Sequence, residues 1–330
     1  MKCAVIGAGA WGTALANVLA ENGHQTTIWA LEPDVAEALE DAHENPRFLP
    51  GISLHASIRG TTEKSAALDG AELVVLASPS HVLRSVLEAC HDWTLPGARL
   101  VVATKGIERG SLALMTTVVG EVLPGRPVIG LSGPSFAAEV AARQPTAIVA
   151  ASRDAAAATF VQSALSSPSF RVYTHDDVVG VELGGALKNV MAVATGISDG
   201  LALGFNARAA LITRGLAEIM RLGSKLGARP GTFAGLAGVG DLVLTCTGAL
   251  SRNRAVGLEI GRGRALADVL AGRETVAEGV TTTESAKALA EREGVDMPIV
   301  TAVHRILFER QPARWALVEL MARGLRGEED

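Results

Sequence analysis

A glycine-rich turn near the amino terminus constrains the fold of this chain more than any other feature. In AVIGAGAWGTALA (4–16), Gly7, Gly9 and Gly12 follow an apolar, strand-like run and open an Ala/Leu-rich helical run. In such a turn the first glycine permits the tight bend, the second lets a pyrophosphate approach the backbone, and the third allows close helix–strand packing. The helix N-terminus then offers unpaired N–H groups to the phosphates. The stretch therefore predicts a dinucleotide-binding turn rather than a glycine loop without a ligand.

The first half of the chain alternates apolar runs with helical patterns. The runs predict strands at 2–6, 25–29, 73–77, 100–103, 128–131, 146–150 and 170–174. Helical patterns lie between them at 12–21, 33–40, 81–89 and 111–122, and the alanine run at 155–158 also favours a helix. Such alternation, with strands apolar throughout, is typical of an α/β fold with a parallel, doubly wound sheet.

The pattern changes after position 177, where no further series of strands is evident. Helices are predicted at 178–198, 208–226, 252–260, 283–293, 298–309 and 313–323. Asp176 and Asp177 are candidate N-caps of the first, and Pro298 and Pro312 suit first-turn positions. A chain of 330 residues suggests two domains. We expect an NAD(P)-binding Rossmann domain over 1–177 and an all-helical substrate and catalytic domain over 178–330.

Composition excludes several classes of protein. The net charge of −5 predicts no broad basic surface and hence no nucleic-acid partner. Cys3, Cys90 and Cys246 are far apart and form no CxxC pair, so neither a disulfide framework nor a metal site is expected. No signal-like segment precedes the first strand, and no uncharged apolar run reaches the ~18–20 residues that span a bilayer. We expect a cytoplasmic protein without membrane insertion, whose helical half would suit a homodimer.

The end of the second predicted strand informs the choice of cofactor. In TTIWALEPD (26–34), Leu31 and Glu32 directly follow the strand, and the stretch contains no Arg or Lys. A carboxylate at this place suits the ribose hydroxyls of NAD, whereas an Arg suits the 2′-phosphate of NADP. The sequence therefore favours NAD. Trp11, in the glycine turn, either packs on the following helix or covers the cofactor, and both interpretations remain open.

Ligands of such sheets bind beyond the carboxyl ends of the strands, where the loops SPSH (78–81), TKGIE (104–108) and SGPSFAAE (132–139) lie. Lys105 would meet a substrate there, unless it is an ordinary solvated lysine. Gly133 and Ser135 flank a proline in a turn whose N–H groups suit an oxyanion or phosphate, although a plain Gly-Pro turn has the same pattern. These loops predict an anion site at this edge of the sheet.

The helical half adds further polar groups. GVGDLVLTCTGALSRNR (238–254) presents Asp241 after a tight glycine loop, then Ser251 as an N-cap with Arg252 and Asn253 in the first turn. An arginine at a helix N-terminus forms an anion site, unless Arg252 is simply a surface residue. ETVAEG (274–279) contributes Glu278.

One predicted helix carries a lysine among small residues. In ELGGALKNV (182–190), Gly184 and Gly185 share a helix face with Lys188, so a ligand or the other domain could approach the backbone there. Taken alone, Lys188 would be interpreted as a lysine that snorkels to solvent. Asn189 is expected to be a hydrogen-bonding neighbour.

These stretches resemble, in the same order, motifs of bacterial NAD(P)-dependent glycerol-3-phosphate dehydrogenases. The shared motifs are GAGAWGTALA, SPSH, TKGIE, LSGPSFAAE, ELGGALKNV, GVGDLVLTCTGALSRN and TVAEG, spanning positions 1 to about 283. The resemblance implies hydride transfer between NAD(P)H and dihydroxyacetone phosphate, giving sn-glycerol 3-phosphate for glycerophospholipid synthesis. Many members carry Arg or His where this chain has Leu31 and Glu32, a departure that again favours NAD.

The resemblance also implies roles for single residues. Lys188 matches the proton-transfer lysine, Lys105 a second active-site lysine that touches substrate and cofactor, and Asp241 the substrate-binding aspartate; these three form the expected catalytic set. Expected substrate positions are Lys105, Gly133, Ser135, Lys188, Asp241, Ser251, Arg252 and Asn253, with Arg252 and Asn253 on the phosphate. Expected cofactor contacts are Gly7, Gly9, Ala10, Trp11, Gly12, Lys105, Ala137, Arg252, Val276 and Glu278.

Hydride addition to a ketone places negative charge on its oxygen, which must be stabilised and protonated. A lysine can do both if burial and a neighbouring cation draw its pKa toward neutrality. We therefore expect Lys188 to be the general acid in reduction and the base in oxidation, with Asp241 favouring its charged form. Two alternatives are a related hydroxyacid dehydrogenase with another substrate and a non-catalytic NAD-binding protein.

Overall fold

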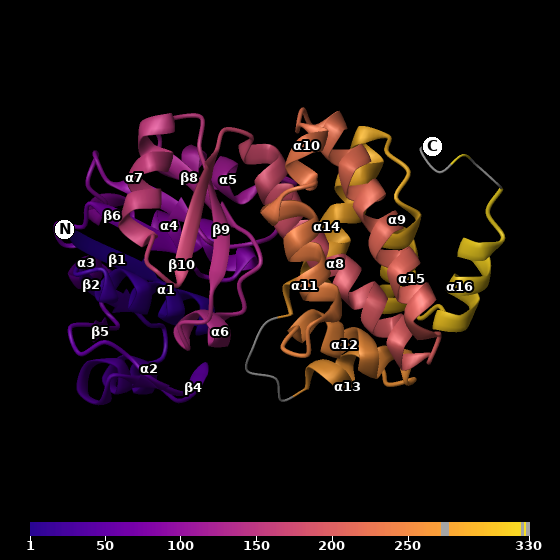
Figure 1. Ribbon diagram of the computed structural model, residues 1–330, viewed down its shortest axis with the longest axis horizontal. Helices are drawn as coiled ribbons and strands as arrows, with labels where there is room; N and C mark the ends of the chain where they lie inside the picture. The colour runs from indigo at the N-terminus through magenta and orange to yellow at the C-terminus, as the bar shows by residue number, and fades with distance from the viewer. Residues whose placement is uncertain (272–276, 325–326, 328–330) are drawn as a thin grey trace.

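The amino-terminal half is built on one eight-stranded sheet, and the carboxy-terminal half is helical (Figure 1). The computed structural model describes residues 1–271, 277–324 and 327. The sheet has the strand order β10-β9-β8-β7-β6-β1-β2-β5, and a two-stranded ribbon pairs β3 with β4. The strands are β1 Lys2–Ile6, β2 Gln25–Trp29, β3 Glu44–Asn45, β4 Leu49–Ser53, β5 Arg59–Thr61, β6 Leu73–Leu76, β7 Arg99–Val102, β8 Val128–Ser132, β9 Thr146–Ala151 and β10 Phe170–His175.

Helices cover both faces of the sheet, because alternate residues of its strands point to opposite sides. In β1, Cys3 and Val5 belong to one apolar core, whereas Ala4 and Ile6 belong to a second. The first core includes side chains of α1 and α7, and the second includes side chains of α3, α4 and α5. These helices are α1 Ala10–Glu21, α2 Pro33–Glu37, α3 Lys64–Leu68, α4 Leu83–Glu88, α5 Met115–Val122, α6 Ala137–Ala141 and α7 Ala155–Leu165.

The predicted α/β sheet is confirmed, with one correction to its all-parallel pairing. All seven predicted strands are present, but β8 and β9 pair antiparallel. The segment between them contains only the five-residue helix α6, which spans about 7 Å. That is too short to return the chain along the sheet as a parallel crossover requires. The strands β9 and β10 then run parallel to each other and antiparallel to β8.

Several element boundaries also differ from the prediction. The helix predicted at 111–122 begins only at Met115, because Leu114 forms an isolated antiparallel bridge with Ile107. The helix predicted at 283–293 begins five residues earlier, at Glu278, and that predicted at 33–40 ends at Glu37 in a π-helical turn. The short elements β3, β4, β5, α3 and α6 were not predicted, and neither were the short helices Pro230–Phe233 (α10), Asp241–Thr247 (α11) and Leu266–Leu270 (α13).

The helical half is organised around one long helix. These helices are α8 Val178–Gly200, α9 Gly204–Lys225, α10 Pro230–Phe233, α11 Asp241–Thr247, α12 Arg252–Gly261, α13 Leu266–Leu270, α14 Glu278–Glu293, α15 Pro298–Phe308 and α16 Ala313–Met321. Helix α8 lies among α9, α11, α12, α14 and α15 (Figure 1). Asp177 caps it, accepting a hydrogen bond from the Gly180 N–H at 2.9 Å, as predicted. Ser251 caps α12 in the same way through the Arg254 N–H at 3.2 Å.

Glycines let α8 and α12 pack backbone to backbone. A Cβ on Gly196 of α8 would overlap the carbonyl oxygen of Arg254, and one on Gly257 of α12 would overlap that of Val193. By length and composition α8 could cross a membrane, but 83% of its apolar stretch is buried inside the molecule. Helix α8 is therefore the core helix of this half.

Candidate active site

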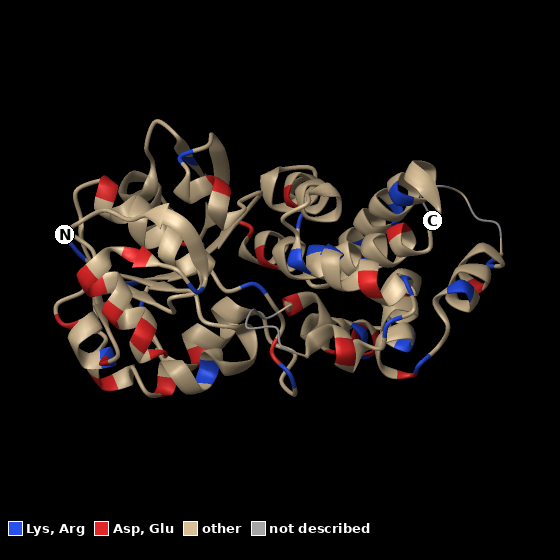
Figure 2. Ribbon diagram, turned by 90° about the horizontal axis from the view of Figure 1, so that it is seen from below, with Lys and Arg blue, Asp and Glu red and all other residues tan. Residues whose placement is uncertain are grey.

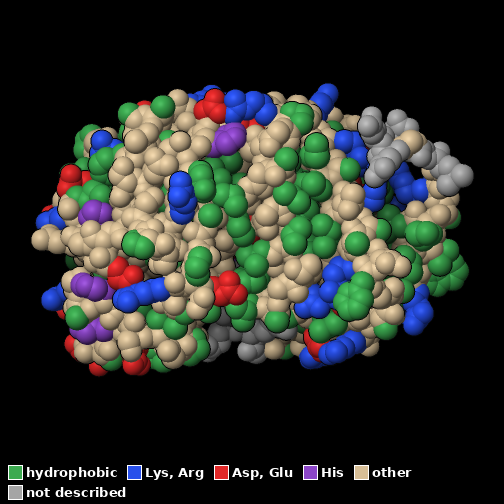
Figure 3. Space-filling view, in the orientation of Figure 1, with side chains coloured by type: hydrophobic (Ala, Val, Ile, Leu, Met, Phe, Trp, Pro, Cys, Tyr) green, Lys and Arg blue, Asp and Glu red, His purple; other side chains and the backbone are tan. Residues whose placement is uncertain are grey.

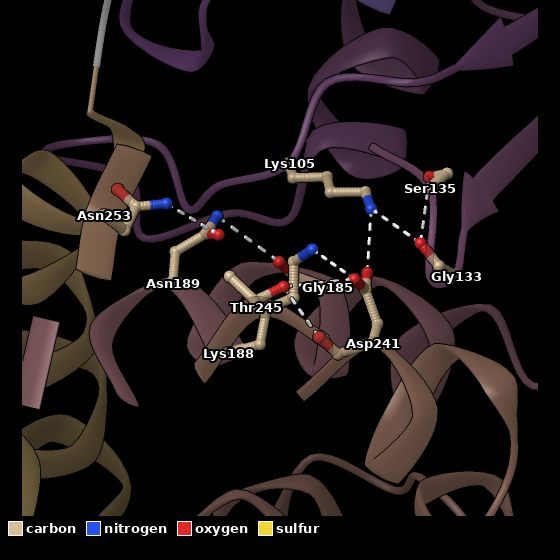
Figure 4. Close-up of polar contacts among 9 residues, drawn as sticks. All are labelled: Lys105, Gly133, Ser135, Gly185, Lys188, Asn189, Asp241, Thr245 and Asn253. Atoms are coloured by element: carbon tan, nitrogen blue, oxygen red, sulfur yellow. Dashed lines mark hydrogen bonds and ion pairs between the residues drawn. The ribbon is translucent and has the colours of Figure 1, made fainter. Parts of the chain in front are cut away.

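Two lysines and one aspartate from three separate elements meet at the carboxyl edge of the sheet (Figure 4). Asp241, fully buried, is the first residue of α11. Its Oδ1 accepts a hydrogen bond from the Nζ of Lys188 on α8, and its Oδ2 accepts one at 2.8 Å from Lys105, which follows β7. The Nζ of Lys105 also donates to the carbonyl oxygen of Gly133, after β8, at 3.3 Å. Four segments of the chain are thereby joined around one carboxylate.

Burial and neighbouring charge set the protonation of this cluster. Burial lowers the pKa of Lys188 to about 7, and the charge of Lys105 acts in the same direction against the attraction of Asp241. Burial raises the pKa of Asp241, but the two ammonium groups outweigh it and hold that pKa below its usual range. Asp241 is therefore ionised at neutral pH, while Lys188 can gain or lose a proton there.

The glycines beside Lys188 leave room for other segments of this chain to approach the helix backbone. A Cβ on Gly184 would overlap the carbonyl oxygen of Ala237, which precedes α11. A Cβ on Gly185 would overlap the hydroxyl of Ser132 at the end of β8 and lie 3.7 Å from Cδ of Lys105. Of the two expectations for this small face, the structure supports close approach of other chain segments, which brings Asp241 and Lys105 to Lys188.

A chain of amide hydrogen bonds adjoins the cluster. Asn189, next to Lys188, accepts a hydrogen bond from Nδ2 of Asn253 at 3.0 Å, and Oδ1 of Asn253 accepts one from the Gly279 N–H at 2.9 Å. This chain links α8, α12 and α14. Asn253 is thus held in one orientation, and its Nδ2 has a second hydrogen for a ligand.

Two further predicted substrate residues, Ser135 in the loop after β8 and Arg252 at the start of α12, do not join the charged cluster. The hydroxyl of Ser135 donates to the Gly133 carbonyl at 3.0 Å. Arg252 begins α12 with an exposed side chain. Arg252 is therefore a cation at a helix N-terminus, as the anion-site prediction requires.

The glycine turn has the geometry of a dinucleotide cradle. Gly7 has φ +117°, and a Cβ there would lie 2.9 Å from backbone atoms of Ala77 and Ser78. A Cβ on Gly12 would overlap the carbonyl oxygen of Gly7, whereas one on Gly9 would meet nothing within 4 Å. The first and third glycines are thus required by the fold, and the second faces open space at the start of α1, where Ala10 is the first helical residue. These residues fit a bound pyrophosphate.

Sequence reasoning missed Asn45, which holds this turn in place. Asn45 is fully buried in β3. Its Nδ2 donates at 2.8 Å both to the carbonyl oxygen of Ala8 and to the hydroxyl of Thr13. Thr13 itself donates to the Ala8 carbonyl at 3.2 Å. Asn45 lies 37 residues from Ala8 in a two-residue strand, so no local pattern could have indicated this contact.

Two features bear on how a nucleotide would be held. Trp11, the second residue of α1, is half-buried against the core, and its Nε1 is buried without a hydrogen-bond partner. Leu31, after β2, is 72% exposed. The structure brings Arg47 to the same strand end, with its Nη1 3.7 Å from Oδ2 of Asp34. The sequence stretch 26–34 lacks a cation, but the folded neighbourhood contains one, paired with an aspartate.

Glu278 connects the two halves of the molecule. Its Oε1 accepts a hydrogen bond from the Ser80 N–H at 3.1 Å, and its Oε2 accepts one from the Ser80 hydroxyl at 2.6 Å. Ser80 belongs to the predicted loop after β6. Ala137, also a predicted cofactor contact, begins α6 and packs against the core next to α1. Val276 lies outside the described residues.

A Rossmann-type sheet with a dinucleotide cradle, beside a buried lysine–carboxylate cluster, defines an NAD(P)-dependent dehydrogenase. Sequence models of the N-terminal and C-terminal domains of NAD-dependent glycerol-3-phosphate dehydrogenase match residues 2–158 and 177–318. The chain belongs to this family.

Individual relatives are similar over the whole chain. The glycerol-3-phosphate dehydrogenase [NAD(P)+] of Geobacter sulfurreducens is 56% identical over 330 residues, covering 99% of this chain and 98% of its own length. That of Myxococcus xanthus is 50% identical over 331 residues, covering 99% of each chain. The crystal structure of glycerol-3-phosphate dehydrogenase from Coxiella burnetii superposes with a TM-score of 0.94 at 41% identity, covering 97% of this chain and 98% of its own.

Proposed function

We propose that this enzyme catalyses the reversible, NAD(P)H-dependent reduction of dihydroxyacetone phosphate to sn-glycerol 3-phosphate, the backbone of glycerophospholipids. The observation that carries the proposal is the Lys188–Asp241–Lys105 cluster, which lies at the same sheet edge as the glycine cradle. The family to which the chain belongs supports this substrate pair. A bound nicotinamide supplies the hydride, and the residues of this chain bind the ketone and move its proton.

Lys188 is the proton-transfer residue of this proposal. Its pKa of about 7 lets it donate a proton to the developing alkoxide and recover one in the reverse direction. Asp241 holds the ammonium group of Lys188 in place and keeps a useful fraction of it charged. Lys105, bound to the other oxygen of Asp241, contributes positive charge at the substrate oxygen and next to the cofactor.

The substrate phosphate lies at the N-terminus of α12 in this proposal. Arg252 offers a bidentate guanidinium, Asn253 the free hydrogen of its amide, and Ser251 shapes the first turn of the helix. Gly133 and Ser135 form the wall of the substrate site on the side of the sheet. The phosphate is thereby bound by one half of the molecule while Lys105 meets the ketone from the other.

The cofactor is bound along the glycine turn in this proposal, with Gly9, Ala10 and Trp11 on its pyrophosphate side and Ala137 and Glu278 completing the contacts among the described residues. We favour NAD over NADP, because exposed Leu31 and half-buried Glu32, rather than a cation, lie just after β2. Arg47 is the nearby cation that would oppose this preference. Turnover with NADH and NADPH decides the matter, and a preference of about a hundredfold for NADPH, near 3 kcal/mol, would contradict it.

We also propose the division into an NAD(P)-binding domain (1–177) and a helical substrate and catalytic domain (178–330), a cytoplasmic location and a homodimer. The division is supported by the change from strands to helices between His175 and Val178. The homodimer is supported by large apolar side chains exposed on α9 and α16, namely Phe205, Trp315, Val318 and Met321. Figure 3 shows hydrophobic side chains on the surface of the helical half. Acidic and basic residues are interspersed along both halves in the view of Figure 2, which fits small-molecule rather than nucleic-acid partners.

The decisive experiment measures NADH oxidation with dihydroxyacetone phosphate in wild type and in Lys188→Ala. Wild-type turnover with a loss of about a thousandfold or more in the variant is expected, because both charge stabilisation and proton delivery are removed. Binding of NADH, followed by fluorescence, should survive. Wild type that binds NADH without turning over this ketone would indicate one of the alternative functions, and an active Lys188→Ala would refute the assigned role.

A further inference from the structure

A buried glutamate on α8, outside the charged cluster, contacts an element that follows the Lys105 loop. Glu182 lies six residues before Lys188 and is 9% exposed. Its Oε1 accepts a hydrogen bond from the N–H of Thr116 at 2.9 Å, and its Oε2 accepts one from the hydroxyl of the same residue. Thr116 is the second residue of α5. Glu182 therefore caps the N-terminus of α5 from another helix, satisfying an N–H that has no partner within α5.

Helix α5 directly follows the loop that carries Lys105. The end of that loop is closed by the bridge between Ile107 and Leu114 and by the hydrogen bond from the Glu108 N–H to the Ala113 carbonyl at 2.9 Å. The loop from Lys105 to α5 is thus a short, closed segment with little freedom at its base. A carboxylate that fixes the first turn of α5 also fixes that base.

Glu182 also contacts β8, the strand that precedes a hydrogen-bond acceptor of Lys105. A Cβ on Gly130 of β8 would lie 3.4 Å from Cγ of Glu182, so the side chain packs on that strand. The same strand leads to Gly133, whose carbonyl oxygen accepts the hydrogen bond from Lys105. Glu182 thus touches α5, at the end of the Lys105 loop, and β8, which leads to a hydrogen-bond acceptor of Lys105, and it belongs to the helix that carries Lys188.

We propose that Glu182 is a positioning residue, which holds the Lys105 loop and β8 against α8 and thereby sets the spacing of Lys105 and Lys188 around Asp241. This inference rests on the proposed roles of the two lysines. Burial of the carboxylate raises the pKa of Glu182 to about 7, so this contact has an energetic cost that an apolar contact would not have. Two hydrogen bonds to a single threonine provide directional positioning in return.

The chain contains a matched control for this proposal. Glu218 on α9 is also buried, and its carboxylate accepts hydrogen bonds from the N–H groups of Ile299 at 2.7 Å and Val300 at 3.3 Å. It caps the N-terminus of α15 as Glu182 caps that of α5, and burial raises its pKa to about 7 as well. Helix α15 contributes none of the residues assigned to the site. Comparison of the two glutamates therefore separates capping of a helix from positioning of the lysines.

The test compares Glu182→Gln, Thr116→Val and Glu218→Gln by thermal unfolding and by kcat and KM across pH. Lys188 faces Asp241, Lys105 and Cys246, so the midpoint of its titration reports their spacing. We expect Glu182→Gln to lower kcat by about tenfold or more, since small misplacements of reacting groups are costly. The pH midpoint of kcat should move by about half a unit or more, in either direction. Thr116→Val should show a smaller effect of the same kind, and Glu218→Gln should keep the wild-type kcat and midpoint.

Wild-type kcat and midpoint in both Thr116→Val and Glu182→Gln, with only a lower Tm, would overturn the proposal and leave Glu182 a structural cap. If Glu182→Gln does not fold, Thr116→Val alone decides, because it retains the backbone N–H and loses only the hydroxyl. An inactive Lys188→Ala, alongside wild-type kcat and midpoint in each of these two variants that folds, would reject this inference while the proposed function stands. An active Lys188→Ala would reject the proposed function itself.

Discussion

Replacing Asp241 with asparagine tests the electrostatics of the site most directly. The change keeps the shape of the side chain but removes the one negative charge between Lys105 and Lys188. Asp241 is fully buried and the Lys188 side chain is 9% exposed, so water screens the loss only weakly. The two ammonium groups would then repel each other without compensation, and the charged form of Lys188 would be disfavoured.

The size of the effect follows from Coulomb's law for an ion pair in direct contact. Two unit charges about 4 Å apart interact by about 4 kcal/mol at the effective dielectric constant of about 20 that describes protein sites. One pKa unit corresponds to about 1.4 kcal/mol, so the pKa of Lys188 should fall by roughly two to three units. Starting from a pKa of about 7, the protonated fraction at neutral pH falls by about a hundredfold or more. Because that fraction supplies the proton for ketone reduction, kcat/KM at pH 7 should fall by about the same factor.

The assay is the pH profile of kcat/KM for reduction, in wild type, Asp241→Asn and a matched control. Asp199 on α8 is the control, since it too is a buried carboxylate between two cations, with Arg208 Nη2 at 2.6 Å and Arg254 Nε at 2.8 Å. Removing either carboxylate should lower the free energy of unfolding by about 1–3 kcal/mol, because charge-assisted hydrogen bonds to two partly buried cations are lost. Only Asp241→Asn should move the midpoint to lower pH. A profile within about half a pH unit of wild type, with kcat/KM within a few fold, would refute the reasoning.

Three further predictions concern other parts of the molecule. Gly12→Ala should abolish NADH binding and lower the Tm, because its Cβ would overlap the carbonyl oxygen of Gly7; unchanged NADH affinity in a fluorescence titration would contradict the cradle. Arg252→Ala should lower kcat/KM for dihydroxyacetone phosphate by a factor equivalent to about 2–4 kcal/mol of transition-state stabilisation, but it should spare unphosphorylated dihydroxyacetone. Equal losses on both ketones would count against a phosphate contact. Glu218 has a pKa raised from 4.5 to about 7, so its stabilising protonated form is retained below about pH 4.5 and lost as the pH rises through 7. Urea unfolding should therefore show a decline of about 3 kcal/mol between pH 4.5 and 8 that Glu218→Gln lacks, and an identical decline in the variant would reject the raised pKa.

The sequence by itself determined the features that depend on neighbours within a few residues. The bend at Gly7, the caps by Asp177 and Ser251, and seven of the eight strands of the large sheet were predictable. Turn geometry and capping act over one to four residues, and a strand buried on both faces needs an uninterrupted apolar run. Ordered motifs also indicated the family, and with it the expectation that Lys188 and Asp241 belong to one site.

Only the tertiary structure decided which distant groups meet and in what state. Asp241 lies 53 residues from Lys188 and 136 from Lys105, and their shared hydrogen bonds exist only because Gly184 and Gly185 let two other segments reach the α8 backbone. The contacts of Asn45 with Ala8, 37 residues away, and of Glu278 with Ser80, 198 residues away, likewise depend on how segments far apart in sequence pack together. Such contacts leave no periodic signal in the chain, because the groups involved are brought together by the burial of whole helices and strands. The same burial lowers the pKa of Lys188 toward neutrality, which no local sequence pattern could have specified.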